Sequence, residues 1–320
     1  MAPLNAASEA AIARLRSYVP PPTAYSSVPL SRRAAVLILL YADAKGDLKV
    51  VVTIRAKTLR SYAGEAALPG GRADSLQETP FQTARREASE EIGLPENTLL
   101  PPFRVEHLCE LPANLAKTEV VVRPCVALLH GYDAVTGLEA DPEVSLIPTL
   151  DAREVAAVFT AGFRDFLSIA PGGDEEWYRG SWSLWHDSQW RIYGTVQYDC
   201  DLLSHFHVFS LSPDRIPTLV HQFFVPKQTI HRSTASTVKV EGDLDLDSAE
   251  SRYRVFGMTA RMLVDAARVA YVQEPEFEHN SHFGDEAMIA KLRRFGRLSA
   301  VRKASDGLTR ETMEKASKLS

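Results

Sequence analysis

The sequence predicts a mixed α/β fold of the α+β kind, in which helices cover a mixed β-sheet. One observation is a pair of β-branched, apolar runs, Ala35–Tyr41 and Leu48–Ile54, which flank turn residues 43–47 and predict a hairpin. A second observation is a well-marked helix over residues 80–93. Because hairpin-linked strands and strands separated by helices occur in one chain, we expect a single mixed sheet with helices packed on it.

The other elements follow from the spacing of apolar residues along the chain. Helices are predicted at Asn5–Tyr18, at Asp151–Phe159 with Asp151 as its cap, and at about Val255–Tyr271. Strands are predicted at Phe103–Leu111, Glu119–Leu129, Trp190–Tyr198 and His205–Leu211.

Composition excludes several classes of function. The chain has 320 residues with 36 Lys and Arg against 41 Asp and Glu, a net charge of −5, which argues against a nucleic-acid partner. Its longest apolar run, residues 34–42, is far shorter than the roughly 20 residues of a membrane-spanning helix, and residues 1–22 do not resemble a secretory signal. We therefore expect an intracellular protein without membrane or nucleic-acid partners. Cys109, Cys125 and Cys200 have no metal or disulfide spacing and are predicted to be buried thiols.

The helix over residues 80–93 carries signals at both of its ends. Thr79 can cap it, Pro80 occupies a first position where a missing N–H has no cost, and Gln82 completes a capping box. Gly93 is a natural stop. At about 100° per residue, four apolar side chains form one buried stripe: Phe81, Ala84, Ala88 and Ile92.

Three glutamates lie along one edge of this predicted helix. Glu87 and Glu91 are adjacent to the buried stripe, and Glu90 lies beside them. Carboxylates crowded in this way repel one another, and a hard divalent cation such as Mg²⁺ relieves the repulsion. A solvated acidic face is the alternative, but the Gly70-Gly71 turn just before the helix would let the backbone approach a ligand closely and favours a site.

Residues 68–94 resemble the signature of Nudix hydrolases, written G-x5-E-x7-R-E-U-x-E-E-x-G-U, where U is a bulky aliphatic residue. The positions in register are Glu78, Arg86, Glu87, Glu90, Glu91, Gly93 and Leu94. Ala88 is smaller than the usual aliphatic residue, and six residues instead of five separate Gly71 from Glu78. This longer spacing resembles the coenzyme A diphosphatase branch of the family.

A second motif of that branch is similar to residues 51–71. The matching residues are Val51–Arg55, Leu59-Arg60, Gly64-Glu65 and Leu68–Gly71. Three positions depart from the motif: Tyr62 stands where that branch usually has His, Ala56 where it has Ser, and Leu68 where it has Phe. The change at Tyr62 alters the donors available for fine specificity. The resemblance extends, more weakly, over about residues 14–271.

The resemblance implies a Nudix-type α/β/α sandwich whose loop–helix–loop holds Mg²⁺ or Mn²⁺ over a diphosphate. By position, Glu87 and Glu91 would be the principal metal ligands, Glu90 a further or water-mediated ligand, and Glu78 an assisting one. Arg86 would hold a carboxylate in place. The general base differs among members of the family, and its candidates here are Glu65, Glu90 and Glu91.

The second motif implies the substrate. Arg55, Arg60 and Gly64, with the Gly70-Gly71 turn, would recognise coenzyme A or an acyl or oxidised form, which is cleaved to adenosine 3′,5′-bisphosphate and 4′-phosphopantetheine. Two alternatives stay open. One is hydrolysis of another nucleoside diphosphate derivative, such as an oxidised deoxynucleotide or NADH, and the other is a Nudix-fold binding module without catalysis.

The expected domain organisation has three parts. Residues 1–30 form a helix and lead-in, residues 31–272 form the Nudix domain with insertions at about 171–190 and 231–251, and residues 273–320 form a charged tail, either a peripheral helix or disordered. The final residues Ser317–Ser320 nearly match a peroxisomal Ser-Lys-Leu signal, so the peroxisome and the cytoplasm are both expected locations. The sequence leaves the oligomeric state open.

Overall fold

The structure of the protein is a computed structural model, which describes most of the chain between residues 3 and 301. The positions outside the description are 1–2, 60, 97–101, 117, 134, 143–150, 152, 170–177, 185–217, 227–228, 233–251 and 302–320. Among these are the strands predicted at Trp190–Tyr198 and His205–Leu211, together with Cys200 and Arg60.

Counted over the described residues, the main sheet has nine strands and mixed directions, which confirms the predicted α/β class. Its long path runs in the order β11-β8-β2-β1-β7-β5, and the short strands β3, β4 and β6 pair with β2, β1 and β7 respectively. β1 runs parallel to β7 and antiparallel to β2, so the predicted hairpin is confirmed. The strands are β1 (Arg33–Ala42), β2 (Leu48–Arg55), β3 (Ala66–Ala67), β4 (Gly70–Arg72), β5 (Arg104–Glu110), β6 (Asn114–Leu115), β7 (Val121–His130), β8 (Val155–Gly162) and β11 (Thr229–Arg232).

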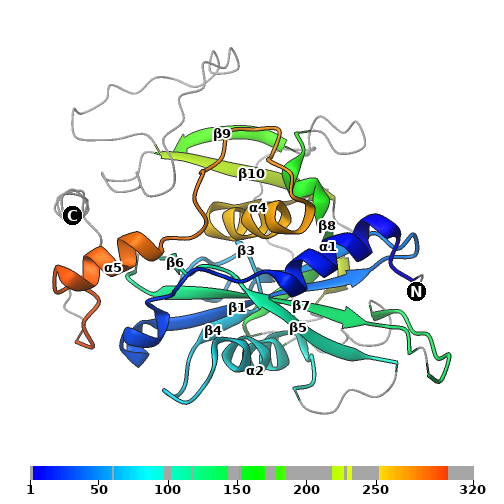
Figure 1. Cartoon of the computed structure of the whole chain (residues 1–320), viewed down its shortest axis with the longest axis horizontal. Coiled ribbons are helices and arrows are strands. Elements are labelled where there is room, and N and C mark those ends of the chain that lie inside the picture. The colour runs from blue at the N-terminus through cyan, green and yellow to red at the C-terminus, as the bar shows by residue number, and fades with distance from the viewer. Residues whose placement is uncertain are drawn as a thin grey trace.

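Helices cover both faces of this sheet (Figure 1). α2 (Pro80–Ile92) lies on one face, while α1 (Ala6–Ser17) and α4 (Gly257–Tyr271) lie on the other. Alternation along β1 explains why both faces are apolar. Leu37 and Leu39 pack in the same cluster as the buried residues of α2, whereas Ile38 and Leu40 pack with α1 and α4.

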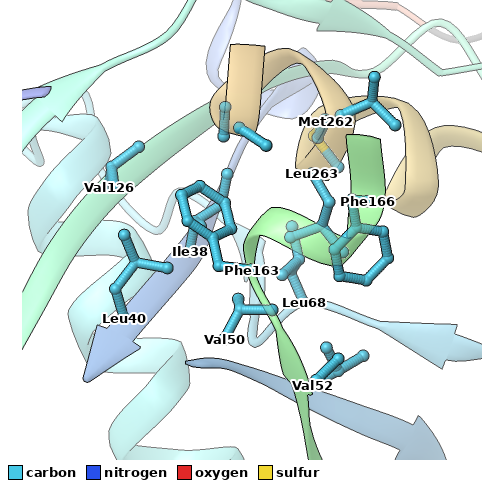
Figure 2. Close-up of a cluster of buried hydrophobic side chains, with 14 of the residues drawn as sticks. Ile38, Leu40, Val50, Val52, Leu68, Val126, Phe163, Phe166, Met262 and Leu263 are labelled. Carbon is cyan, nitrogen blue, oxygen red and sulfur yellow. The ribbon is translucent and has the colours of Figure 1, made fainter. Parts of the chain in front are cut away.

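The larger core lies between the sheet and α4. Figure 2 shows aliphatic side chains of β1, β2 and β7, such as Ile38, Val50 and Val126, gathered near Phe163 and the α4 residue Leu263. In the part of the chain that the structure describes, a second sheet of three strands, in the order β12-β10-β9, lies beyond α4 (Figure 1). Its strands are β9 (Tyr178–Leu184), β10 (Thr218–Pro226) and β12 (Arg252–Phe256), with β9 in the predicted insertion 171–190.

Two predicted elements need correction. The helix predicted at Asp151–Phe159 is wrong, because this region contains β8, which pairs antiparallel with β2 and with β11. β8 contributes to both cores, with Phe159 in the cluster that contains α4 residues and Val158 in the cluster that contains α2 residues, so its apolar residues do not alternate and resemble a short helical stripe. The helix predicted from about Val255 begins at Gly257 instead, since Val255 belongs to β12. The predicted insertion 231–251 begins within β11, and its positions 233–251 lie outside the described residues.

The segment after α4 is anchored to the rest of the molecule. α5 (Glu286–Arg294) buries Ile289 and Leu292, which pack with residues of β6 and β7. Just before α5, Asp285 accepts hydrogen bonds from Arg261 of α4 at 3.0 Å and from the backbone N–H of Leu115 at 2.8 Å. Packing of this kind makes residues 273–301 part of the folded body.

Two further sequence predictions concern the described residues. Cys109 and Cys125 are buried free thiols, as predicted. Within the described part of the chain, no helix is both long and apolar enough to cross a membrane.

Candidate functional site

The candidate site is built on α2, and its ends are fixed by local hydrogen bonds. The Thr79 hydroxyl accepts the Gln82 N–H at 3.2 Å, and the Gln82 side chain accepts the Thr79 N–H at 2.9 Å, which is the predicted capping box. Gly93 ends the helix with φ 67°, a left-handed conformation that favours glycine. Because both ends of α2 are fixed, its glutamate side chains leave the helix in a defined direction.

That direction brings two glutamates against the Gly70-Gly71 backbone of β4. The Gly70 N–H donates to the Glu91 carboxylate at 3.0 Å. At Gly71 a Cβ would lie 2.5 Å from the carboxylate atoms of Glu87, so only glycine leaves room for that side chain. The predicted turn and two of the predicted metal-ligating glutamates therefore lie together.

The electrostatics of this glutamate edge are unfavourable without a cation. Only 3% of Glu91 is exposed, and its pKa is raised to about 8, mainly by burial and also by the charges of Glu87 and Glu154, against the lowering effects of the Gly70 N–H and Arg55. Burial also raises the pKa of Glu87, with Arg86 opposing and with Glu90 and Glu154 adding to the rise. Carboxyl groups in this situation gain stabilisation from a positive charge placed between them.

Arg86 holds the outer side of this edge. Its guanidinium donates to Glu78 at 2.8 Å, to Glu87 at 3.1 Å and to the backbone oxygen of Arg72 at 2.7 Å. Glu78 also accepts the Asp74 N–H and the Thr83 hydroxyl, both at 2.9 Å. Although burial opposes it, these bonds hold the pKa of Glu78 below its ordinary value. Both oxygens of Glu78 are thus engaged in fixing Arg86 and the loop.

Glu90 has a different environment from Glu87 and Glu91. Its side chain is 59% exposed and lies 3.5 Å from Arg86. Within the described ranges, no three His, Cys, Asp or Glu side chains converge closely enough to hold a metal ion. The two carboxylates of Glu87 and Glu91 nevertheless suit Mg²⁺, which typically takes one or two protein carboxylates and completes its shell with water and substrate phosphates.

The second motif lies beside this edge. Arg55 is close enough to Glu91 and Glu65 for its charge to lower the pKa of each, although burial dominates and raises both. The Arg55 Nε is buried and has no hydrogen-bond partner among the described residues. Gly64 has φ 74° and donates its N–H to the Arg55 backbone oxygen at 3.1 Å. This hydrogen bond joins the two ends of the loop between Arg55 and Gly64. Arg60 lies outside the described residues.

Sequence reasoning assigned no role to two charged residues that lie near the site. Glu154 precedes β8 and acts electrostatically on Glu87 and Glu91, and Arg254 of β12 acts on Glu65. Glu154 was hidden within the wrongly predicted helix. Arg254 arrives from a strand about 100 residues further along the chain, and no local pattern marks it.

Comparison with known proteins identifies the family. A model of the NUDIX domain matches residues 31–167. Over 297 residues the chain is 30% identical to peroxisomal coenzyme A diphosphatase 1 of Saccharomyces cerevisiae, covering 88% of this chain and 82% of that one. The chain belongs to the Nudix hydrolase family. This Nudix hydrolase is therefore an enzyme of the diphosphatase type, and the α/β/α fold inferred from the resemblance is confirmed.

Other relatives match smaller parts. This Nudix hydrolase is 42% identical over 98 residues to peroxisomal coenzyme A diphosphatase ndx-8 of Caenorhabditis elegans, covering 30% of this chain and 40% of that one. It is 29% identical to Nudix hydrolase 22, chloroplastic, of Arabidopsis thaliana, covering 77% of this chain and only 58% of that one. Among solved structures, a C. elegans Ap4A hydrolase binary complex matches with a TM-score of 0.29 at 16% identity, covering 41% of this chain and 81% of that one.

The contact between Gly71 and Glu87 yields a test of this site. In Gly71→Ala, the new methyl group should displace the Glu87 carboxylate, because the flexible end of that side chain is the part that must shift. We expect metal-dependent diphosphate hydrolysis to fall by roughly 10- to 100-fold, a loss typical of catalytic groups misplaced by about 1 Å. The thermal unfolding midpoint should change little.

Gly137→Ala is the matched control for this substitution. Gly137 has φ 69° and no atoms near its would-be Cβ, so alanine there strains the backbone without touching the glutamate edge. The Gly137→Ala variant should lose stability and keep normal turnover. If Gly71→Ala also lost stability while its activity per folded molecule stayed normal, Gly71 would have only a structural role.

Proposed function

We propose that this Nudix hydrolase cleaves the diphosphate of coenzyme A, or of an acyl or oxidised coenzyme A, to adenosine 3′,5′-bisphosphate and 4′-phosphopantetheine. The observation that carries the proposal is the buried edge of Glu87 and Glu91 against Gly70-Gly71, with Arg55 beside it. The choice of substrate is supported by the relatives from yeast and C. elegans that are named coenzyme A diphosphatases.

In this proposal Mg²⁺ or Mn²⁺ is held by Glu87 and Glu91, with Glu90 as a further or water-mediated ligand. When bound, such an ion neutralises the diphosphate and lowers the pKa of a coordinated water. Glu78 acts mainly through Arg86, since its oxygens accept bonds from Arg86, the Asp74 N–H and Thr83. Arg86 in turn holds Glu87 at 3.1 Å, so it is proposed to be a positioning residue.

Arg55 is proposed to bind a substrate phosphate. A buried guanidinium Nε without a partner among the described residues is costly, and an anionic oxygen would satisfy it. The candidates for the general base remain Glu65, Glu90 and Glu91. Glu65 lies next to Arg55 along the strand pair, because the Arg55 N–H donates to the Glu65 backbone oxygen at 3.0 Å.

A single assay tests the function. The purified chain is incubated with coenzyme A and Mg²⁺ or Mn²⁺, with and without excess chelator, and the products are identified by mass. We expect adenosine 3′,5′-bisphosphate and 4′-phosphopantetheine in equal amounts only when metal is present. A parallel panel contains an oxidised deoxynucleoside triphosphate and NADH. If either were turned over with a kcat/KM about tenfold above that for coenzyme A, the proposed substrate would be wrong.

Glu154 offers a sharper test of the metal site. Its carboxylate adds negative charge next to Glu87 and Glu91, so Glu154→Gln should weaken the attraction for a divalent cation. We expect the Mg²⁺ concentration for half-maximal activity to rise by about two- to fivefold, because Glu154 is exposed and acts on the site only through its charge. Folding should be unaffected because the side chain is exposed. Glu9→Gln, at an exposed position of α1, is the matched control, and an equal Mg²⁺ dependence in both variants would exclude this role for Glu154.

Location is proposed from the same relatives. Two of them are named peroxisomal, and residues 317–319 read Ser-Lys-Leu. We propose a peroxisomal enzyme, and imaging of the chain with and without Ser320 tests it. Retention in the cytoplasm by both forms would contradict the proposal.

A further inference from the structure

A cavity of about 430 Å³ lies on the flank of α2 that faces away from the glutamate edge. Its lining includes Phe81 and Arg85 of α2, and Phe103, Arg104 and Val105 at the start of β5. Gln82 and Glu96 complete it. The volume lies within the range of roughly 300–1,000 Å³ that is typical of small-molecule sites. None of these residues belongs to the proposed catalytic site.

We propose that this cavity is a second ligand site, which binds a small molecule made of a planar ring and an anionic group. The ring would lie against the aromatic side chains. Phe81 and Phe103 both contribute to the lining, and Phe81 is stacked on His107 with ring centroids 4.0 Å apart and planes 10° apart. A ring held in this stacked position keeps its place when a ligand enters, so it provides a preformed face for a second ring.

The anionic group would pair with the guanidinium groups. Two arginines and one glutamate line the cavity, which leaves an excess of one positive charge. Arg85 is 93% buried; its Nη2 donates to the Pro95 and Glu96 backbone oxygens, while its Nη1 has no hydrogen-bond partner among the described residues. A small rotation of this guanidinium would present the spare donor to a ligand.

Arg104 supplies the second guanidinium at the mouth of the cavity. Its side chain is 63% exposed and its Nη2 lies 2.9 Å from His130, while Glu106 is 3.8 Å away. Glu106 is itself paired with Arg16 at 2.8 Å, so it does not fully neutralise Arg104. The pair of arginines thus favours a carboxylate or phosphate, and the charged mouth favours its entry.

The test uses probes that separate ring from charge. Adenosine 5′-monophosphate and benzoate carry both features, adenosine carries only a ring, and acetate and inorganic phosphate carry only charge. Binding is measured by calorimetry and by ligand-observed NMR, with excess chelator present so that the catalytic edge holds no metal. We expect one or both of the combined probes to bind about tenfold or more tightly than its separate parts. The two probes distinguish a nucleotide from an aromatic carboxylate as the source.

Substitutions of residues that line the cavity test whether the probes bind there. Arg104→Ala and Phe103→Ala should each weaken binding by about tenfold, and Val105→Trp should block it by filling the space. Arg164→Ala and Phe295→Ala remove an exposed arginine and an exposed ring elsewhere and should bind normally. Circular dichroism confirms that each variant is folded. Binding that survives all three cavity variants, or that is lost in Glu87→Gln, would overturn the proposal, as would the absence of binding by either combined probe.

Discussion

Replacing Glu91 with Gln is expected to lower metal-dependent hydrolysis by about 10²–10³-fold or more while making the metal-free protein more stable. Gln keeps the size of the side chain and can still accept the Gly70 N–H, but it removes a carboxylate that is 97% buried beside Glu87. The unfolding midpoint in excess chelator at about pH 8 should rise by roughly 2–4 °C for each kcal/mol recovered.

The pH dependence of stability follows from the same group. A carboxyl group with a pKa of about 8 when folded, against an ordinary value of 4.5, binds more protons in the folded state between those two values. The metal-free wild type should therefore lose stability as pH rises from about 5 to about 8, because ΔG of unfolding falls wherever the folded state binds more protons. Glu91→Gln should flatten this part of the profile.

The affinity for a metal ion should change with pH in the opposite direction to the stability of the metal-free protein. Because the cation must displace the proton of Glu91, its affinity should rise with pH up to about 8. Calorimetric titration with Mn²⁺ at about pH 6 and about pH 8.5 measures this difference. A metal affinity that is independent of pH, together with normal turnover by Glu91→Gln, would show that Glu91 is not a ligand.

Replacing Glu119 with Ala is expected to destabilise the protein by roughly 3–5 kcal/mol. Glu119 is fully buried, forms an ion pair with the fully buried Arg32 at 3.1 Å, and accepts a hydrogen bond from Arg297 at 2.9 Å. Its loss leaves the charge of Arg32 without its carboxylate in the protein interior. Denaturant unfolding monitored by circular dichroism measures the change.

Two further variants separate charge from packing. Arg16→Ala breaks an ion pair whose arginine is 51% exposed, so it should cost no more than about 1 kcal/mol. The double variant Arg32→Met with Glu119→Leu removes both buried charges and should recover much of the stability that Glu119→Ala loses. A double variant as unstable as Glu119→Ala would mean that packing, and not the unpaired charge, accounts for the loss.

Features that are encoded locally could be predicted from the sequence. The limits of α2 follow from Thr79, Gln82 and Gly93, which act within one helical turn of its ends. The hairpin of β1 and β2 follows from two apolar runs around a turn. The placement of Glu87, Glu90 and Glu91 along one edge of α2 follows from helical spacing alone.

Features that depend on distant segments could not be predicted in this way. β8 was predicted as a helix because its adjacent residues Val158 and Phe159 are both buried, in the clusters on opposite faces of the sheet, which removes the usual alternation of apolar and polar residues. Arg55 and Glu91 were expected to lie in one site only through the family resemblance. The cavity beside Arg85 requires β5 to pack against α2, and no sequence spacing reports that contact.

The contacts made by the segment after α4 bear on which fragment of this chain can fold independently. Glu286 accepts hydrogen bonds from the Ala113 N–H at 2.9 Å and from the buried Arg123 of β7 at 3.0 Å. A fragment limited to the matched residues 31–167 would leave Arg123 without this carboxylate and would uncover the β1 face that packs on α4. The smallest autonomous unit of this enzyme is consequently much longer than the segment that defines its family.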